Sequence, residues 1–229
     1  MTIRKLILFD IDGTLLHSKG ATREAKAQAM IEVFGTASSV REHHFGGKTD
    51  WQILHEVLEK EGISSAEIGQ KMALYEETFA LKLAEVIGNF DVEALAGAHE
   101  LVAYFRDHDD YMLGLVTGNS STTAPIKLRA ANFDPAWFVV GAYGSESDNR
   151  NDLPPLALER AIAIAGHDIT PQDVIIIGDT VADVDCTRAL GGVVATVFTG
   201  FEDRDKLIAS EPDYLLDDLT QFLDRVALD

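Results

Sequence analysis

The stretch Leu6-Ile7-Leu8-Phe9-Asp10-Ile11-Asp12-Gly13-Thr14 joins an apolar run to two carboxylates and a glycine. The apolar run is typical of a buried strand, and its end at Asp10 predicts the edge of a sheet. Because side chains alternate along a strand, Asp10 and Asp12 are expected to project to the same side. Gly13 allows a sharp turn directly after them. Two acids at this spacing repel each other and need a cation or a shared proton, so we expect metal-assisted chemistry here.

Three helical patterns follow this strand. Apolar residues recur at helical spacing over 21–34, 51–61 and 66–86. Gly35 and Gly62 are typical helix-ending residues for the first two patterns, and Ser65 is expected to cap the third. The segment from about residue 17 to residue 90 is therefore predicted to be all-helical.

From residue 97 onward, helical and strand patterns alternate. Helices are expected over 98–106, 121–131, 156–165, 181–190 and 219–226, and strands over 112–117, 137–140, 174–177, 192–198 and 214–216. This alternation predicts a parallel sheet with helices on both faces, that is, a three-layer, Rossmann-like α/β core.

The helical segment interrupts this core directly after its first strand. We assign residues 1–16 and 92–229 to the α/β core domain and residues 17–91 to a helical cap domain. Open α/β sheets bind ligands at the carboxyl ends of their strands, and an insertion at this point lies above that edge. The cap is therefore expected to act as a lid.

The bulk composition describes an acidic globular protein. Its 229 residues, 46% apolar and 25% charged, can form a sizeable core with one large insertion. No apolar run approaches the roughly 18 residues that span a bilayer. The net charge of −19 argues against nucleic acid or an anionic membrane as the main partner. The acidity reflects either a solubilising surface or a salt-adapted source.

Two further features indicate a cytoplasmic protein. Cys186 is the only cysteine, which excludes an intrachain disulfide and fits a reducing compartment. The apolar stretch after Arg4 and Lys5 is broken at Asp10, which is too early for a secretory signal. The sequence leaves open whether the protein is a monomer or a homodimer.

Thr117, Gly118 and Asn119 follow the predicted strand 112–117. A hydroxyl and loose backbone amides before a helix suit a phosphate oxygen. The same residue types are also common in turns that bind nothing.

Asp179 and Asp183 stand at the end of the predicted strand 174–177 and at the start of the next helix, so both can face one point. Hard oxygen ligands of this kind suit Mg²⁺. Alternatively, Asp183 only stabilises the helix N-terminus. Asp185 lies off that face and is assigned to the surface.

Arg150 lies in the loop before the helix 156–165. A cation there could offset the carboxylates and hold a phosphoryl group, although an isolated loop arginine is more often simply exposed.

The combination and order of these segments resembles the haloacid dehalogenase superfamily of phosphotransferases over nearly the whole chain. Residues 10–14 match its first motif, Asp-x-Asp-Gly-Thr. Thr117 matches the second, and residues 178–183 match the fourth. The segments 47–50 and 115–119 are similar to phosphoglycolate phosphatase-type members with a helical cap.

The third motif departs from that pattern. Relatives usually carry Lys-Pro-x-Pro where this chain has Arg150-Asn151-Asp152-Leu153. Arginine keeps the charge but presents a planar fork in place of a point charge. Lys127 is the alternative cation.

The resemblance implies a Mg²⁺-dependent phosphatase that hydrolyses a small phosphorylated metabolite. Asp10 would attack phosphorus and form an aspartyl-phosphate. Asp10, the backbone carbonyl of Asp12 and Asp179 would hold Mg²⁺, with Asp183 in or near the metal shell. Thr117 and Arg150 would hold the remaining phosphoryl oxygens, and Gly118 and Asn119 would complete that site.

Asp12 is expected to protonate the leaving oxygen and then to accept a proton from water. That role needs Asp12 protonated in the first step, and the negative surroundings favour the protonated form. Superfamily members that cleave C–Cl or C–P bonds lack an Asp at this position, so its presence favours phosphate esters.

The predicted cap contains the unusual segment His43-His44-Phe45-Gly46-Gly47-Lys48-Thr49-Asp50. Gly47 and Lys48 match a substrate-facing loop in the resembling families and are assigned to substrate binding. His43 and His44 are assigned to the surface or the cap core, and His17 to the hinge.

Two other functions remain open. A phosphomutase would share the chemistry as far as the aspartyl-phosphate and pass the group to a sugar phosphate. A non-catalytic phospho-receiver would use a similar set of residues, but receivers are far shorter and lack the helical insertion.

Overall fold

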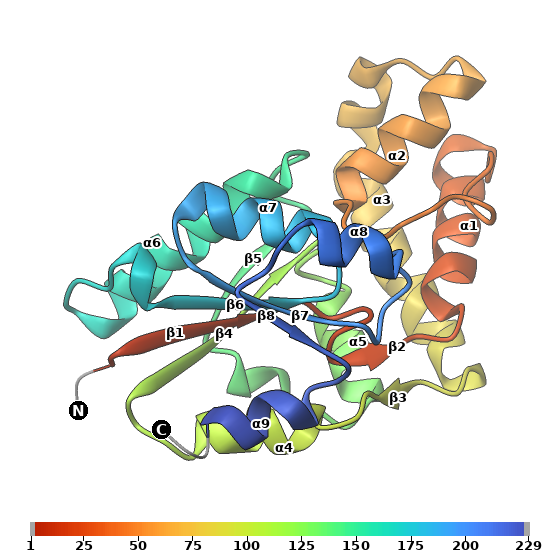
Figure 1. Ribbon diagram of the computed structural model, residues 1–229. Helices are drawn as coiled ribbons and strands as arrows, with labels where there is room; N and C mark the ends of the chain where they lie inside the picture. The colour runs from red at the N-terminus through yellow and green to blue at the C-terminus, as the bar shows by residue number, and fades with distance from the viewer. Residues whose placement is uncertain (1–2, 227–229) are drawn as a thin grey trace.

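A six-stranded parallel sheet forms the centre of the computed structural model, which describes residues 3–226 (Figure 1). The strands follow the spatial order β5-β4-β1-β6-β7-β8. Their bounds are β1 Lys5–Phe9, β4 Tyr111–Thr117, β5 Val140–Tyr143, β6 Val174–Gly178, β7 Val193–Val197 and β8 Tyr214–Leu216. The predicted parallel α/β sheet is thus confirmed, and the strand that precedes Asp10 lies at its middle.

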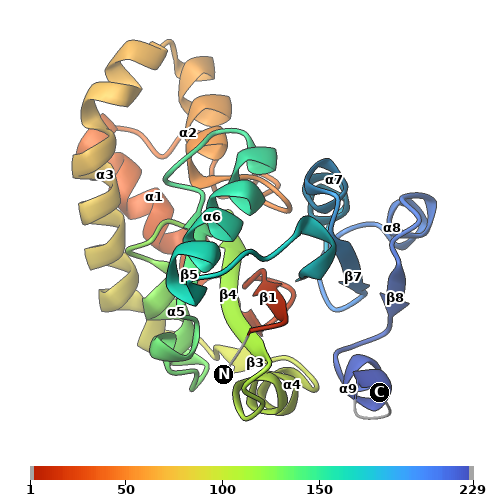
Figure 2. The ribbon, with the colours of Figure 1, turned by 90° about the vertical axis from the view of Figure 1, so that its left-hand side faces the viewer.

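Helices cover both faces of the sheet (Figure 2). Helices α4 (Ala98–Arg106), α5 (Ala124–Ala130) and α9 (Thr220–Val226) pack on one face, and α6 (Leu153–Ala165) and α7 (Val181–Leu190) cover the other. A short helix, α8 (Arg204–Ala209), connects β7 to β8.

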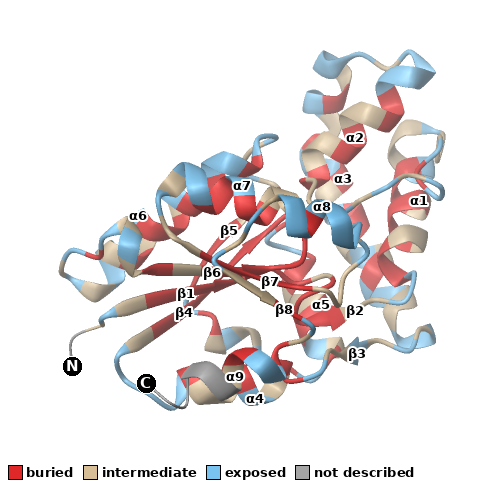
Figure 3. Cartoon of the chain, in the orientation of Figure 1, coloured by how far each residue is buried: buried red, intermediate tan, exposed pale blue. Residues whose placement is uncertain are grey.

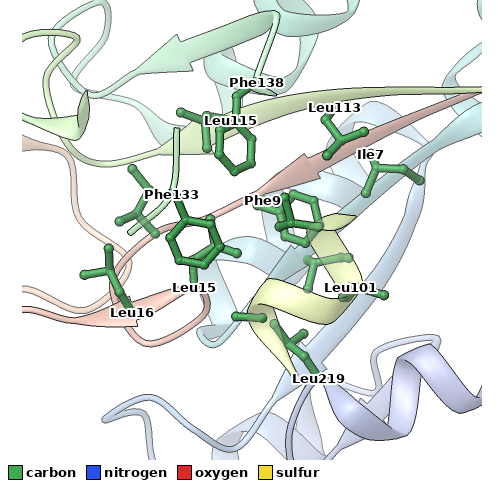
Figure 4. Packing of buried hydrophobic residues seen from close by; sticks show 14 of the residues in the cluster. Ile7, Phe9, Leu15, Leu16, Leu101, Leu113, Leu115, Phe133, Phe138 and Leu219 are labelled. Carbon is green, nitrogen blue, oxygen red and sulfur yellow. The ribbon is translucent and has the colours of Figure 1, made fainter. Parts of the chain in front are cut away.

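Strand β1 explains why two helical layers form. Ile7 and Phe9 join the apolar cluster under α4, whereas Leu6 and Leu8 join the cluster under α6. The Phe9 ring meets Phe138 edge-on, with ring centroids 6.1 Å apart, in the packing that Figure 4 shows. A strand that is apolar on both sides must be covered on both sides to be removed from water.

The helical insertion consists of α1 (Ala21–Phe34), α2 (Asp50–Leu58) and α3 (Ser65–Val86) and lies beyond the carboxyl ends of the strands. Its helices turn their buried faces towards one another (Figure 3), around residues such as Met30, Leu54 and Phe79. The chain enters it through β2 (Leu16–His17) and leaves through β3 (Glu93–Ala94), and these two strands pair antiparallel.

Short 3-10 turns complete the elements, at Glu59–Glu61, Ile87–Asn89, Pro135–Trp137, Arg150–Asp152 and Pro171–Asp173. No helix between residues 3 and 226 is both long and apolar enough to cross a membrane.

Several predicted boundaries are wrong for local reasons. The N-cap of α3 is Ser64, whose hydroxyl accepts a hydrogen bond from the Glu67 backbone, and not Ser65. Strand β5 begins at Val140 instead of residue 137, because Asp134 caps the 3-10 turn that occupies 135–137.

Helix starts and short elements account for the other differences. Helix α6 begins at Leu153 rather than at residue 156, because Pro154 and Pro155 occupy the first turn, where no backbone N–H is needed. Helix α5 begins at Ala124 rather than at residue 121. The segment 17–90 is not entirely helical, since it contains His17 of β2, and neither β2, β3 nor α8 was predicted.

Candidate active site

A cavity of about 340 Å³ lies between the carboxyl ends of the central strands and the helical insertion. It brings together residues from segments that lie far apart in the sequence. The sequence-predicted residues that line it include Asp10, Asp12, Lys48, Arg150 and Asp179. Phe201 lies at the same cavity with 82% of its surface exposed, and its ring lies beside that of His17.

Asp10, Asp179 and Asp183 form a buried cluster at this cavity. Each offers a carboxylate oxygen within 4.8 Å of the others. Asp10 follows β1 and Asp179 follows β6, and these strands are neighbours in the sheet. Gly13 has a φ of +86°, and a Cβ there would collide with the Asp179 carboxylate, so the turn after the first motif requires glycine.

The cluster is short of positive charge. Burial raises the pKa of Asp179 well above its usual value, and the neighbouring Asp183 and Asp10 raise it further. Burial also raises the pKa of Asp10, although Arg150 offsets part of this effect. Oxygen ligands that are reluctant to ionise without a cation fit a divalent metal ion such as Mg²⁺.

Arg150 is buried and bridges two of the three carboxylates. Its Nη2 lies 3.0 Å from Asp10 Oδ2 and 2.5 Å from Asp183 Oδ1. Arg150 begins the 3-10 turn Arg150–Asp152, which Asn149 caps through a hydrogen bond from the Asn151 backbone. The side chain is therefore a member of the cluster and not an exposed loop arginine.

Asp183 belongs to the carboxylate cluster and also stabilises the structure through hydrogen bonds to Thr180 and Arg150. Its Oδ2 accepts hydrogen bonds from the Thr180 backbone N–H and hydroxyl, at 3.0 and 2.7 Å, in a capping box at the start of α7. Its Oδ1 accepts the hydrogen bond from Arg150. Asp183 thus stabilises the helix N-terminus and also belongs to the carboxylate cluster, while a contact with Mg²⁺ stays a prediction. Asp185 is exposed, as predicted.

Asp12 lies at the same cavity but has a cation of its own. Lys127 Nζ donates to Asp12 Oδ2 at 2.6 Å, and Asn119 Nδ2 donates to the same oxygen at 2.9 Å. Ser18 donates to Oδ1 at 3.4 Å. Each of the two carboxylates therefore has a cationic side chain of its own, Arg150 for Asp10 and Lys127 for Asp12.

This pairing corrects the expectation that Asp12 favours its protonated form. Burial alone would raise the pKa of Asp12, but the charge of Lys127 and the hydrogen bonds from Lys127, Asn119 and Ser18 outweigh it. The pKa of Asp12 is therefore lowered, and the carboxyl is ionised at neutral pH in the free protein.

Thr117 and Asn119 connect the two carboxylates. Thr117 is fully buried at the end of β4 and hydrogen-bonds to the Asp10 carboxylate. Its hydroxyl oxygen accepts from the Asn119 backbone and side chain, at 3.3 and 2.8 Å. Gly118 packs against the helical insertion: its carbonyl accepts from the Asp50 backbone N–H, and a Cβ would collide with the carbonyl of Lys48.

Lys48 lines the cavity but is turned towards the helical insertion. Its ammonium pairs with Glu56 and lies 3.4 Å from His43 Nε2. His43 Nε2 lies 2.8 Å from the same Glu56 carboxylate, and His44 lines the cavity. Gly47 has a φ of +72° and packs against Ala182 and Thr180. The 46–50 loop is thus docked on the core.

Sequence reasoning missed the partners that orient this site. Lys26 Nζ lies 2.5 Å from Asp50 Oδ1, and Asp50 Oδ2 accepts from the Ser120 backbone. Thr14 donates to Asp179 Oδ1 at 3.1 Å. The sequence indicates Lys127 only as an alternative cation to Arg150 and gives no sign of its pairing with Asp12.

A signal for the two lysines was nevertheless present in the sequence. Lys26 is four residues before Met30, and Lys127 is three residues after Ala124, so each shares a helix face with a buried apolar residue. A lysine on an apolar face requires a buried acidic partner.

Comparisons with known proteins agree with this geometry. The family model of haloacid dehalogenase-like hydrolases matches residues 4–191. A phosphoglycolate phosphatase from Synechococcus elongatus is 26% identical over 222 residues, which cover 96% of each chain. The pyrophosphatase PpaX from Listeria monocytogenes is 23% identical over 95% of this chain and 94% of its own.

A solved structure shares the fold. The crystal structure of a hydrolase from Pseudomonas syringae superimposes with a TM-score of 0.69 over 97% of each chain, at 21% identity.

Proposed function

The chain belongs to the haloacid dehalogenase-like hydrolases, and from that premise we propose that it is a Mg²⁺-dependent phosphatase acting on a small phosphorylated metabolite. The observation that carries the proposal is the arrangement of Asp10 and Asp12. Both carboxylates line one cavity, and each has its own buried cation. Two acids kept apart in this way can perform different steps of one reaction.

Asp10, Asp179 and the backbone carbonyl of Asp12 would hold the metal ion, with Asp183 beside them. The mutual approach of the three carboxylates within 4.8 Å and the raised pKa values of Asp10 and Asp179 support this assignment. Mg²⁺ supplies the positive charge that a phosphoryl dianion needs before a carboxylate can approach it.

We assign the role of nucleophile to Asp10. Its carboxylate oxygen forms a bond to phosphorus while the bond from phosphorus to the leaving oxygen breaks, which yields an aspartyl-phosphate. Arg150 and Thr117 contact Asp10 directly and are therefore positioned to hold the phosphoryl oxygens, with the Gly118 and Asn119 backbone beside them. Water then attacks phosphorus, the bond to Asp10 breaks, and inorganic phosphate leaves.

We assign acid and base catalysis to Asp12. The free protein holds this carboxyl ionised, and the arrival of a negatively charged phosphoryl group beside it favours the uptake of a proton from solvent. Asp12 passes that proton to the leaving oxygen in the first step. In the second step the ionised carboxylate accepts a proton from the attacking water.

The helical insertion supplies the rest of the cavity, and we propose that it acts as a cap that selects the substrate. The cavity volume of about 340 Å³ suits a phosphoryl group with a small organic group attached. Gly47 and Lys48 contribute to its wall. The name of the Synechococcus relative makes 2-phosphoglycolate the first substrate to test.

Phosphate release tests the proposal. The protein is expected to release phosphate steadily from p-nitrophenyl phosphate and from members of a metabolite panel that includes 2-phosphoglycolate. This turnover should need Mg²⁺ and stop in EDTA. Dependence on a sugar bisphosphate would indicate a phosphomutase instead, and a phospho-Asp10 that persists without turnover would indicate a phospho-receiver.

The first prediction concerns the nucleophile. Asp10→Asn should lower kcat at least about 1000-fold, because the amide cannot form the acyl phosphate. Asp185→Asn is the matched control, since Asp185 is an exposed carboxylate on α7 outside the cavity. Near wild-type turnover by folded Asp10→Asn, checked by circular dichroism, would overturn the assignment.

A further inference from the structure

Lys127 is the buried cation beside Asp12, and the proposed reaction steps assign it no task of its own. It lies on α5 with 1% of its side chain exposed, and its ammonium donates to Asp12 Oδ2 and to Asn119 Oδ1, both at 2.6 Å. Burying an ammonium costs free energy unless its hydrogen bonds are made. Here two of them are made, and both acceptors, on Asp12 and Asn119, lie at the cavity.

The contacts around Asp12 are unequal between its two oxygens. Oδ2 accepts from Lys127 and from Asn119 Nδ2. Oδ1 accepts only the long 3.4 Å hydrogen bond from Ser18 among the contacts of the described residues. The carboxyl torsion of an aspartate is intrinsically broad, so donors fixed on one oxygen decide where the other one lies.

Asn119 adds a second constraint. Its amide oxygen accepts from Lys127, while its amide nitrogen donates to Asp12 and to the Thr117 hydroxyl at 2.8 Å. Lys127 therefore fixes Asn119 as well as Asp12. Both residues line the cavity, but 40% of the Asp12 side chain is exposed and only 1% of the Lys127 side chain is, so the carboxyl is the more accessible of the two.

We infer that Lys127 is a positioning residue that fixes Asp12 Oδ2 and leaves Oδ1 for proton transfer to the leaving oxygen. The inference rests on the proposed phosphatase function. Lys127 acts through Asp12 and forms no bond to the reacting atoms. Arg150 performs a separate task, since its guanidinium contacts Asp10 and Asp183.

The leaving group of the substrate provides a selective test. An alkoxide needs its proton as the bond to phosphorus breaks, whereas p-nitrophenolate is stable enough to leave without one. A misplaced Asp12 should therefore impair alkyl phosphates much more than p-nitrophenyl phosphate. A variant with a merely disturbed fold would lose both activities to the same extent.

The second prediction follows from this difference. Lys127→Met should lower kcat about 100-fold for an alkyl phosphate that the wild-type protein hydrolyses and no more than about tenfold for p-nitrophenyl phosphate. KM should change little for either. Lys127→Arg, which retains donors for Asp12 and Asn119, should recover part of the alkyl phosphate activity. Arg129→Met, on the exposed side of α5, is the matched control and should match wild type.

Equal losses for the two substrates in Lys127→Met would overturn the inference while leaving the phosphatase assignment intact. Lys127→Gln, which keeps an uncharged donor, provides the same comparison if the methionine variant does not fold, and equal losses there would also overturn it. Absence of phosphate release by the wild-type protein from either substrate would reject the proposed function itself.

Discussion

Asp179 has the least favourable surroundings of the buried acids in the cluster. It is 3% exposed and lies beside Asp10 and Asp183. Among the described residues, the Thr14 hydroxyl is the one side-chain group that donates a hydrogen bond to it. A raised pKa means that the folded protein binds the proton more tightly than the unfolded chain does. Proton binding by Asp179 therefore stabilises the folded protein most below pH 3.8, the usual pKa of an aspartate. This stabilisation is lost as pH rises through the higher pKa that Asp179 has in the folded protein.

The third prediction concerns this pH dependence. In EDTA, Asp179→Asn should gain thermal stability relative to wild type as pH rises from about 4 to about 8, because the variant has no carboxyl to ionise there. Mg²⁺ should stabilise the wild-type protein more at the upper end of this range, since the ion competes with the proton for Asp10 and Asp179. The measurement is the melting temperature across the pH series.

Asp185→Asn serves as the control in the same series and should follow wild type at every pH. A constant difference between Asp179→Asn and wild type would show that Asp179 ionises as freely in the folded protein as in the unfolded chain. In that case the burial and mutual repulsion of the clustered carboxylates would not destabilise the protein, and a metal ion would have no such effect to offset.

At the level of elements, a buried ion pair joins two helices of the insertion, and its aspartate also hydrogen-bonds to the core. Lys26 of α1 and Asp50 of α2 pair at 2.5 Å, and Asp50 also accepts from the Ser120 backbone of the core and donates its own N–H to Gly118. The two helices and the loop after β4 therefore meet at one carboxylate. The loop that carries Gly47 and Lys48 ends at this point.

The fourth prediction is that Asp50→Leu lowers the free energy of unfolding by about 3–5 kcal/mol, because it leaves the Lys26 ammonium buried and unpaired. The double variant Lys26→Met with Asp50→Leu should recover most of that loss. Urea unfolding measures both. Glu67→Ala, which breaks the exposed Glu67–Lys71 pair on α3, should cost about 0.5 kcal/mol or less. A double variant no more stable than Asp50→Leu would contradict this account.

The elements themselves could largely be predicted, because their signals are local. Helix α1 runs over the predicted residues, since Ala25, Ala29 and Met30 repeat with the helix period and Gly35 closes it. Strand β2 could not be predicted, because two residues are too few to show the apolar–polar alternation of a strand. Their pairing with β3 depends on how the rest of the chain folds.

The site was predictable as a set of residues but not as a set of contacts. Strand ends identified Asp10, Thr117 and Asp179 as neighbours, since parallel strands present their carboxyl ends at one edge. The pair between Lys127 and Asp12 joins positions 115 residues apart and depends on how α5 packs. For that reason the protonation state expected for Asp12 was wrong.

The molecule as a whole carries a net charge of −19, and this charge acts on its stability. Like charges spread over one surface repel each other in the folded state more than in the expanded chain. At low ionic strength this repulsion extends over about 30 Å, whereas at 1 M salt it is screened within about 3 Å.

The fifth prediction is that NaCl raises the melting temperature of this protein between about 0.01 and 0.5 M. The expected rise is a few degrees, which corresponds to roughly 1 kcal/mol for a chain of this size. KCl at equal concentrations is the control and should act alike, because screening depends on ionic strength and not on the cation. A melting temperature that falls with salt would show that attractive ion pairs outweigh the net repulsion.

The paired strands β2 and β3 affect how the helical insertion can change in length and sequence during evolution. The chain enters the insertion through Leu16–His17 and leaves it through Glu93–Ala94, and Leu16 pairs directly with Ala94 in this two-stranded ladder. A segment whose two ends are already held together can be lengthened, shortened or exchanged at little cost, since closing a longer loop adds only about 0.6 kcal/mol per doubling. Evolution can therefore replace the helical insertion at this junction, and with it the part of the cavity wall that selects the substrate, while the residues at the strand ends stay the same.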